Sequence, residues 1–318
     1  MKFKAKLSLQ HTQLLYNLIT PLSRLQSPTS STPTILYLDN DKMVLSTRGS
    51  SKHDAEGIFC FAELLTTEGI FHSHIIQSIA ADNAILMEIC LVQFRTALKD
   101  LLGTQKEVEG RSSFGQEVTI KLAKRNGGLP HLCLDTRDVF ISESGMGMHH
   151  MIPVKIMSVE EFQYHVPPRL GMPDVQLALP KDRPMKTVVD RLRTISPHIF
   201  LEASMNGFLT LRLDGDGASI RTTFNKLIPI HEDCKSSQED ATQTQDGNRE
   251  PVKCTVKVDS KKLYASLHWQ GTFSIRDLSS AVLCLWENEM LVLDVTLNPE
   301  VGRFMYYVPV HYISQDDF

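Results

Sequence analysis

The sequence lacks several features that would assign a chemistry at once. Its 318 residues contain no G-x-x-x-x-G-K phosphate loop, no G-x-G-x-x-G after a strand and no H-E-x-x-H zinc motif. It also lacks an excess of positive charge, since 33 Lys and Arg stand against 37 Asp and Glu, for a formal net charge of −4. The common nucleotide-binding and zinc-hydrolase motifs are therefore absent, and so is the bulk basic character that usually accompanies nucleic-acid binding.

Paired cysteines and long apolar runs are missing too. The six cysteines are Cys60, Cys90, Cys133, Cys234, Cys254 and Cys284. They form no C-x-x-C pair and have no His at zinc-finger spacing, so we expect reduced thiols, mostly packed as small apolar side chains. Reduced thiols fit a cytosolic or nuclear chain. Glu88 breaks the richest apolar run, 84–94, so no membrane span is expected, and the alternating lysines of 1–7 indicate a half-exposed strand rather than a signal peptide.

The first half of the chain alternates strand-like and helix-like segments. Apolar residues recur at helical spacing over 10–26 and 91–102, and Gly103 is a suitable stop for the second helix. Asn40-Asp41-Lys42 predicts a hairpin turn between two β-rich runs. Strands are expected at 2–7, 34–39, 43–47, 57–65, 83–89, 116–123, 129–135 and 152–157.

Residues 159–174 interrupt this pattern, and the same order then begins again. Prolines and Gly171 crowd this segment, which predicts an extended connector. Helices are expected at 185–195 and 260–269, the second with Asp259 as its N-cap, and Asn206-Gly207 predicts a hairpin turn. Strands are expected at 175–179, 198–203, 208–213, 219–225, 252–258, 281–287, 290–297 and 304–312.

The repeated order predicts an α+β fold of two similar domains, each an antiparallel sheet with two helices. The first domain would span 1–158, the connector 159–174 and the second domain 175–318. A polar segment, 231–251, carries a net charge of −4 and is expected to be an inserted surface loop.

Positive charge is concentrated on the four predicted helices. Together these four segments carry a charge of +6. Because the net charge of the whole chain is −4, the rest of the chain carries −10. Solvated helix faces explain the charge of any one helix, but the same sign on all four suggests one shared surface that meets phosphate.

Three other patterns have simpler readings. The segment 214–217 resembles the start of a calcium loop but lacks the remaining ligands, so it is expected to be a plain turn. His149-His150 has no acidic or thiol ligand at suitable spacing and is expected to lie in a surface loop. Ser142 and Ser144 could be combined with scattered His and Asp residues into a catalytic triad, but no nucleophile-elbow motif surrounds them and no such role is expected.

Four patches of residues resemble a known family. They are Met-Lys-Phe-Lys-Ala-Lys (1–6), Ile-Pro-Val-Lys-Ile (152–156), the helix Met-Lys-Thr-Val-Val-Asp-Arg-Leu-Arg-Thr-Ile-Ser (185–196) and Leu-Glu-Ala-Ser-Met-Asn-Gly-Phe-Leu-Thr-Leu-Arg-Leu (201–213). They are similar to the Hus-one subunit of the checkpoint sliding clamp. In element order the resemblance covers essentially the whole chain, and 185–213 is its most specific part.

The resemblance implies a DNA clamp fold of the processivity-factor type, with two inward-facing helices in each domain. Three subunits, of Hus-one, Rad-nine and Rad-one types, would close into a ring around double-stranded DNA. The implied role is DNA-damage checkpoint signalling and DNA repair in the nucleus, with a clamp loader ATPase and checkpoint and repair proteins as partners. No catalytic residue, metal or cofactor is expected.

The resemblance also gives candidate sites. The candidates for facing DNA are Lys181, Arg183, Lys186, Arg191, Arg193, Arg95, Lys99, Lys261 and Lys262. Pro153 cannot donate to a strand ladder, so 152–157 should be an edge strand. The implied subunit interfaces contain Ile152, Val154 and Ile156 on one side and Ile220, Thr222 and Phe224 on the other. Phe162, Tyr164, Leu170 and Met172 would border a pocket for partner peptides, although a connector packed on its own domain fits them equally.

Two alternatives remain open at this point. One is a replicative-type homotrimeric processivity clamp, and the other is a hydrolase or transferase whose site is assembled from dispersed residues. Because the chain ends just after its last predicted strand, we expect no long phosphorylated tail of the Rad-nine type.

Overall fold

The computed structural model describes residues 1–25, 33–48, 57–80, 82–106, 117–124, 128–137, 148–181, 185–215, 218–230, 252–297 and 301–313. The chain divides into two compact units. Unit 1 consists of Met1–Pro168, Ala265–Ser279 and Val295–Tyr306, and unit 2 consists of Arg169–Tyr264, Ser280–Asp294 and Tyr307–Phe318. The chain therefore first passes from unit 1 to unit 2 inside the predicted connector. Two later segments return to unit 1, which a division into simple halves does not anticipate.

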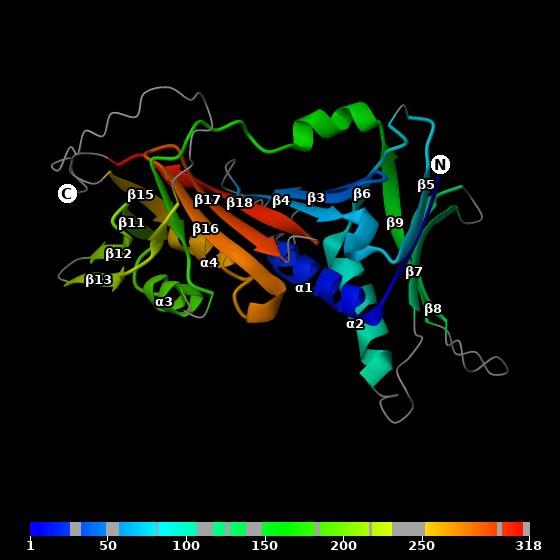
Figure 1. The fold of residues 1–318 in the computed structure, drawn as a ribbon, viewed down its shortest axis with the longest axis horizontal. Coiled ribbons are helices and arrows are strands. Elements are labelled where there is room, and N and C mark those ends of the chain that lie inside the picture. Colours follow the sequence, from blue (N-terminus) through cyan, green and yellow to red (C-terminus); the bar gives the residue numbers. More distant parts are fainter. Residues whose placement is uncertain are drawn as a thin grey trace, which may run out of the picture. The chain divides into compact units, whose positions relative to one another are not determined.

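Eleven main elements form the first half of the chain (Figure 1). They are β1 (Lys2–Leu7), α1 (Leu9–Leu25), β2 (Thr34–Leu38), β3 (Lys42–Arg48), β4 (Phe59–Leu65), β5 (Ser73–Gln77), β6 (Ile85–Ile89), α2 (Leu91–Lys106), β7 (Glu117–Lys124), β8 (Pro130–Arg137) and β9 (His149–Met157). A π-helical turn, Thr66–Ile70, follows β4, and a 3-10 helix, Val159–His165, follows β9.

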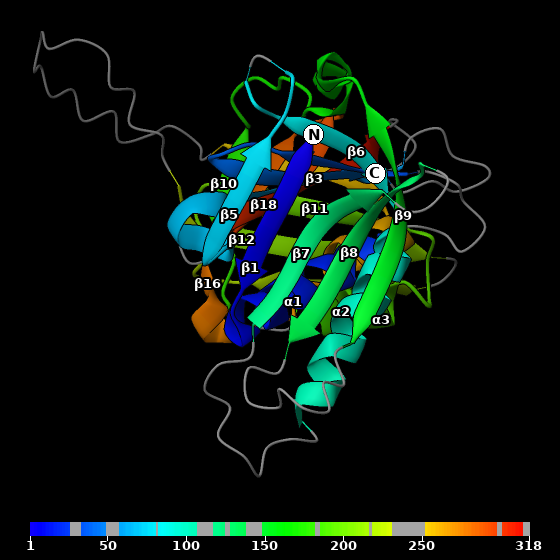
Figure 2. The same cartoon turned by 90° about the vertical axis from the view of Figure 1, so that its right-hand side faces the viewer.

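Two antiparallel sheets of unit 1 share strand β9. The first has the order β5–β1–β7–β8–β9 and is seen face-on in Figure 2. The second has the order β9–β6–β2–β3–β4. Strand β9 serves both because Pro153 and the residues before it pair with β8, whereas Val154–Met157 pair with β6.

The second half repeats this plan. Its elements are β10 (Val175–Ala178), α3 (Met185–Leu192), β11 (His198–Ser204), β12 (Phe208–Gly215), β13 (Ala218–Phe224), β14 (Ile228–Pro229), β15 (Lys253–Asp259), α4 (Ser260–Ser266), β16 (Leu278–Trp286), β17 (Met290–Leu297) and β18 (Gly302–His311), with a 3-10 turn, Ile275–Asp277, before β16. The order β14–β10–β16 repeats β5–β1–β7, and β18–β15–β11–β12–β13 repeats β9–β6–β2–β3–β4.

Helices and inward strand faces form the cores. In unit 1, α1 packs against α2, and Leu15, Leu18 and Leu22 of α1 are fully buried with Phe94 and Leu98 of α2 nearly or fully so. Each such side chain contributes about 1.5–3 kcal/mol when it leaves water. The buried positions recur every three or four residues, which is why the helical period was readable from the sequence.

Strand β5 was not predicted. Its burial pattern places only Ile76 in the core, and the segment is short and polar, so it carries little strand signal of its own. It is held by pairing with β1, where Phe3 lies opposite Ile76. Tertiary pairing, rather than local propensity, determines this strand.

The predicted extended connector is wrong over its first part. Val159–His165 forms a 3-10 helix, whose start is fixed because Glu161 Oε1 accepts a hydrogen bond from Ser158 N at 3.1 Å. This is half of the Ser-x-x-Glu capping box, a local signal that the proline-rich composition further along obscured.

The surface-loop prediction for His149-His150 is also wrong. Both residues lie in β9, opposite Asp135 and Leu134 of β8. The plain turn predicted at 214–217 lies partly outside the described residues, because 216–217 are not among them. Ser142 and Ser144, the serines considered for a catalytic triad, lie wholly outside them.

Three helices end at other residues in the structure than the sequence predicted. Helix α2 continues through Gly103 to Lys106, because an exposed glycine weakens a helix without ending it. Helix α3 stops at Leu192 rather than 195, since Pro197 disfavours helical geometry at Ser196. Helix α4 ends at Ser266, before the predicted 269.

Among the described residues, no helix is both long and apolar enough to cross a membrane. Five cysteines fall in that part of the chain, and none is in a disulfide. Cys60, Cys133, Cys254 and Cys284 are buried as expected, whereas Cys90 is exposed; Cys234 lies outside the described residues.

Candidate nucleic-acid interface and strand edges

Helices α1 and α2 present basic residues of two kinds. Lys99 of α2 is exposed, whereas Arg95, one turn earlier, is half-buried and donates from Nη1 to Ser23 Oγ of α1 at 3.0 Å. Arg24, at the end of α1, is exposed and lies 3.2 Å (Nη1 to Nδ1) from His268. Arg95 thus joins the two helices, and Lys99 and Arg24 supply the outward charge of this pair.

Helix α3 places two of its cations on an aromatic ring of α4. The guanidinium of Arg193, just beyond the last turn of α3, lies 4.0 Å from the centre of the Tyr264 ring, and Lys186 Nζ lies 5.7 Å from it. Arg193 also binds Asp190 through Nε at 2.7 Å and Nη2 at 2.6 Å. The guanidinium of Arg193 therefore makes its main contacts within the protein. The cation–π contacts with Tyr264 stabilise the packing of α3 and the residue after it against α4.

The remaining candidates of unit 2 differ in exposure. Asp259 caps α4, since its Oδ1 accepts from the backbone N of Lys261 at 2.8 Å and of Lys262 at 2.9 Å. The side chains of Lys261 and Arg191 are exposed, and those of Lys262 and Lys181 are half-buried. Arg183 lies outside the described residues.

Of the eight predicted DNA-facing residues that the structure describes, three are thus exposed: Lys99, Arg191 and Lys261. Neither Arg24 nor Tyr264 was among the residues predicted from the sequence to contribute to this surface. Charge counting could not find Tyr264, because tyrosine carries no charge and its partners Lys186 and Arg193 lie far from it in the sequence.

The charged face of the β5–β1–β7–β8–β9 sheet has a different character. Lys6 Nζ lies 2.7 Å from Glu117 Oε2, Lys121 Nζ lies 2.7 Å from Asp135 Oδ2, and His149 Nδ1 contacts the same Asp135 carboxylate. Partial burial alone would raise the pKa of Asp135, but the contacts with Lys121 and His149 lower it below its usual value. These cross-strand ion pairs account for His149, and no cluster suited to a metal ion occurs among the described residues.

Strand β13 is an edge strand in the part of the chain that the structure describes. Its residues pair with β12 from Ala218 to Phe224, and no described strand has a paired register with its other side. Ile220, Thr222 and Phe224 are half-buried on one face, and the alternate residues are exposed. An open edge of this length offers a row of backbone donors and acceptors to another chain.

The first part of β9 is a second edge. Thr136 N of β8 donates to Met148 O at 3.1 Å, so the even-numbered residues of β9 direct their backbone groups at β8 and the odd-numbered ones direct theirs away. Pro153 therefore faces the open side, where its missing N–H costs no ladder bond.

The side chains of β9 lie differently from what an interface made of Ile152, Val154 and Ile156 would need. Ile152 and Val154 are buried in the core of unit 1 and Ile156 is half-buried, whereas Pro153 and Lys155 are exposed. The strand offers its backbone and its exposed side chains to a partner, since alternate residues of a strand face opposite sides.

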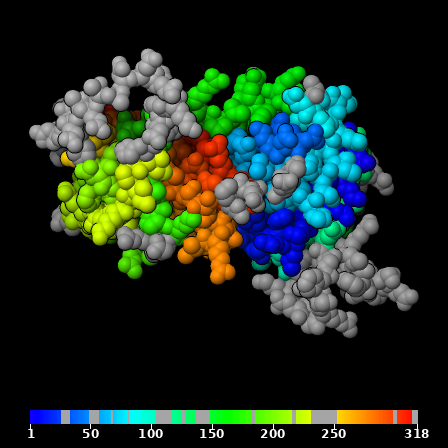
Figure 3. All heavy atoms as spheres, in the orientation of Figure 1, coloured from blue at the N-terminus to red at the C-terminus, as the bar shows by residue number. Residues whose placement is uncertain are grey.

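The four predicted pocket residues are not brought together within either unit. Phe162 stacks on Tyr37 of β2 with ring centres 4.3 Å apart, while Tyr164 is exposed. Leu170 and Met172 belong to unit 2. The 3-10 helix that carries Phe162 stands on the surface of unit 1, as the green atoms at 159–165 in Figure 3 show.

Known proteins of one family are similar to this chain over most or nearly all of its length. The family described as Hus1-like protein matches residues 1–311. Checkpoint protein HUS1 of Homo sapiens is 24% identical over 314 residues, covering 97% of this chain and 99% of the human protein. Checkpoint protein hus1 of Schizosaccharomyces pombe is 26% identical over 260 residues, covering 78% and 82% of the two chains.

A solved structure shares the fold. PCNA from Thermococcus kodakaraensis superposes with a TM-score of 0.58 at 13% identity, covering 97% of this chain and 100% of that one. The α+β clamp fold expected from the sequence is confirmed by this likeness together with the repeated antiparallel sheets. With a family match over residues 1–311 and a sliding-clamp fold, the chain belongs to the Hus1-like protein family.

Proposed function

We propose that the chain is one subunit of a heterotrimeric ring that encircles duplex DNA at damage sites, with Rad-nine and Rad-one types as the other two subunits. Family membership and the sliding-clamp fold support a checkpoint clamp subunit in the DNA-damage response. In this proposal the chain has no catalytic role, acts in the nucleus, is placed on DNA by a clamp loader ATPase, and recruits checkpoint and repair proteins.

One observation carries the ring: the fold already contains the strand pairing that a ring requires. Strand β4 pairs with β3 on one side and β18 on the other, and Leu65 N donates to Val301 O at 2.9 Å where that second contact ends. In the repeated plan β13 corresponds to β4 and β9 corresponds to β18. The open edges of β13 and β9 are therefore the two halves of the same pairing, each without its partner in the described part of the chain.

Pairing β13 of one subunit with β9 of the next would repeat the β4–β18 contact between chains. Such contacts run head to tail and close into a ring when the rotation per subunit allows it. Ile220, Thr222 and Phe224 are half-buried, so a neighbouring strand would cover more of them. The division into a first domain, 1–158, a connector, 159–174, and a second domain, 175–318, belongs to this proposal.

The mechanism is topological in this proposal. A closed ring needs only weak, sequence-independent phosphate contacts, because enclosure itself prevents dissociation. We assign these contacts first to the exposed Lys99, Arg191 and Lys261, while Lys186 and Arg193 are engaged with Tyr264.

A triple charge reversal tests the DNA-facing surface. Replacing Lys99, Arg191 and Lys261 with Glu should weaken association of the assembled ring with DNA. It should also reduce the slope of log K against log salt by about 0.9 for each phosphate that the protein no longer neutralises. Fluorescence anisotropy on duplex DNA measures this, and native mass spectrometry checks that the ring still forms.

The matched control reverses three exposed lysines on strands, Lys2, Lys4 and Lys253. It should leave the salt slope unchanged. An equal loss of DNA binding in both triple variants would refute the assignment to the helices, and loss of ring assembly in the helix variant would show that those charges are structural.

A further inference from the structure

Arg221 lies at the centre of β13, the edge strand of the unit 2 sheet (Figure 1). Its side chain is exposed, and no hydrogen bond or ion pair engages it within the described residues. The residue directly opposite on β12 is Arg212, so two arginines share one cross-strand pair. Like charges in directly opposite positions destabilise a sheet. Arg221 would therefore gain from a carboxylate on its other, open side.

Two carboxylates on this face of the sheet bind Arg212 instead. Glu202 Oε1 lies 2.5 Å from Arg212 Nε. Asp214 contacts Arg212 Nη1 through Oδ2, and its Oδ1 accepts a hydrogen bond from Ser219 Oγ at 2.9 Å. Because the Arg212 side chain is only 7% exposed, its charge depends on these two carboxylates in place of water. They are therefore engaged where Arg221 is not.

The row of residues that crosses the sheet through Arg221 is positively charged. The strand registers place Arg221, Arg212, Phe200 of β11, Lys257 of β15 and His311 of β18 in this row. The Phe200 ring has the Arg212 guanidinium 4.3 Å from its centre and Lys257 Nζ 5.5 Å from it. A chain that pairs with β13 would extend the row by one position, next to Arg221. The local potential there favours a negative side chain.

Strand β9 of a second copy would not supply that negative side chain. When two strands pair in one sheet, residues on the exposed face of one strand adjoin residues on the exposed face of the other. On β9 this face carries the odd-numbered residues His149, Met151, Pro153, Lys155 and Met157. None of them is acidic, so in any register Arg221 of one copy would meet a neutral or basic side chain of the next.

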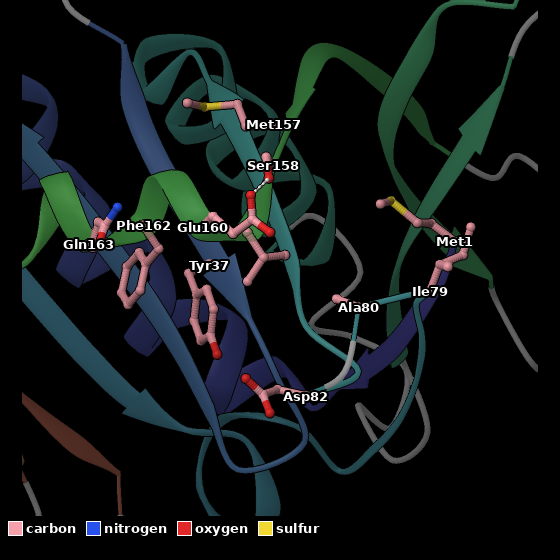
Figure 4. A pocket seen from close by; sticks show the side chains of 11 residues that line it. Met1, Tyr37, Ile79, Ala80, Asp82, Met157, Ser158, Glu160, Phe162 and Gln163 are labelled. Carbon is pink, nitrogen blue, oxygen red and sulfur yellow. Dashed lines mark hydrogen bonds between the residues drawn. The ribbon is translucent and has the colours of Figure 1, made fainter.

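The carboxylates beside β9 are engaged within unit 1. Glu88 Oε1 of β6 lies 3.2 Å from Lys155 Nζ, and the Lys155 side chain is still 71% exposed. Asp135 of β8 is held in the cross-strand ion pairs described above. Beyond the strand, Glu160 Oε2 accepts a hydrogen bond from Ser158 Oγ at 3.2 Å (dashed in Figure 4). Each of these three carboxylates therefore already has a partner in its own unit.

We propose that Arg221 makes the β13 edge selective for a clamp subunit whose own edge strand carries a carboxylate on its exposed face. The same arginine disfavours pairing with a second copy of this chain, since β9 presents Lys155 on that face. The proposal rests on the ring of the proposed function and specifies the chemistry of one neighbour in it. Specificity comes from attraction to the acidic edge together with repulsion from the basic one.

Charge reversal at Arg221 tests the attraction. Arg221→Glu should weaken the association of the full-length chain with one of its two sister subunits by more than tenfold, about 1.4 kcal/mol, and leave the other association unchanged. Sedimentation velocity with each sister subunit separately measures this. Raising the salt concentration should weaken the same association in the parent chain and not in Arg221→Gln, because exposed charges are screened.

The matched control is Lys253→Glu. Lys253 is an exposed lysine of β15, a strand that is paired on both sides, so its reversal makes the same change in charge away from both edges. It should leave both associations unchanged. A thermal melt of each variant checks that unit 2 remains folded.

Self-association of the isolated chain tests the repulsion. Arg221→Glu places a carboxylate on the β13 edge that can meet Lys155 of a second copy, so this variant should self-associate more strongly than the parent chain. Adding Lys155→Glu should abolish the gain, because two acidic edges then face each other.

Three results would overturn the proposal. Unchanged affinity of Arg221→Glu for both sisters would show that the β13 edge does not select by charge, while the ring itself would stand. Equal self-association of the parent chain and the Arg221→Glu variant would exclude the repulsion. If the parent chain bound neither sister, the ring of the proposed function would be refuted, and the edge requirement with it.

Discussion

Arg212 is an almost fully buried cation on a sheet of unit 2. Its guanidinium lies 4.3 Å above the centre of the Phe200 ring, its Nε binds Glu202 Oε1 at 2.5 Å, and its Nη1 contacts Asp214. Two carboxylates and a ring replace the water that the guanidinium loses on folding. Removing the arginine would leave the two carboxylates without their shared cation.

Arg212→Ala should therefore lower the free energy of unfolding by about 1–3 kcal/mol, because a buried side chain and its charge-assisted hydrogen bonds are lost while the two carboxylates keep partial access to water. The matched control is Arg221→Ala, which lies directly opposite on β13 and is exposed, and should change stability by less than about 0.5 kcal/mol. Urea denaturation of both variants measures the difference. Equal, small effects would show that Arg212 is not held as described.

Tyr37 gives a prediction about alkaline pH. Its pKa in the folded chain is raised to about 12 by burial and by Asp39 and Asp82, while the unfolded value is near 10. Between these values the unfolded state loses the proton first, so the stability that Tyr37 contributes is intact below pH 10 and falls as pH rises toward 12.

Tyr37→Phe should remove this part of the pH dependence. Melting temperatures measured from pH 9 upward should fall less steeply in the variant than in the parent chain, and the phenolate absorbance of the folded parent should contain one more late-titrating tyrosine. Identical slopes in the two proteins would contradict the raised pKa.

At the scale of the element, strand β9 separates two kinds of backbone position. The odd-numbered residues face the open edge and the even-numbered ones bond to β8, as the Thr136–Met148 hydrogen bond indicates. Pro153 already occupies an odd position. A second proline should therefore be tolerated by the fold at Met151 and not at Ile152.

Met151→Pro should leave the melting temperature of the isolated chain nearly unchanged and weaken its association with the neighbouring subunit by more than tenfold, about 1.4 kcal/mol, because the edge donor is removed. Ile152→Pro should instead unfold unit 1, since it breaks a ladder bond in a buried strand. Circular dichroism and sedimentation velocity distinguish the outcomes. If the Met151→Pro variant assembled normally, β9 would not be the edge that pairs with the neighbouring subunit.

The long periodic elements were readable from the sequence because their burial pattern is local. Helices α1 and α2, the Asn206-Gly207 turn and the Asp259 cap follow from residue spacing and from the conformations that side chains favour; Gly207 has φ +81°, as its turn requires. Strand β5 depends on β1, whose paired residues lie about seventy positions earlier in the chain, so no local pattern marks it.

The candidate site was predictable only in part, for the same reason. Composition showed that the helices carry positive charge, and the i,i+3 spacing of Asp190 and Arg193 allows their ion pair. Spacing could not show that Tyr264 engages Arg193, or that Arg95 bonds to Ser23. Likewise, Phe162 was selected from the connector, whereas its stacking partner Tyr37 comes from an element far away in the sequence.

At the scale of the whole molecule, two copies of one plan explain the ring proposal. The strand orders of the two halves correspond, and within the chain β4 and β18 already make the contact that β13 and β9 lack in the described residues. A chain built in this way should assemble with similar chains through the same pairing. The same pairing could form with sister subunits or with identical copies of this chain. Only the composition of the closed ring distinguishes these two cases.

Native mass spectrometry of the complex purified through this chain tests that central claim most directly. We predict a complex with one copy of this 35.9 kDa chain and one copy each of two different clamp-like subunits. A stable monomer, or a closed assembly of three copies of this chain alone, would contradict the heterotrimeric ring.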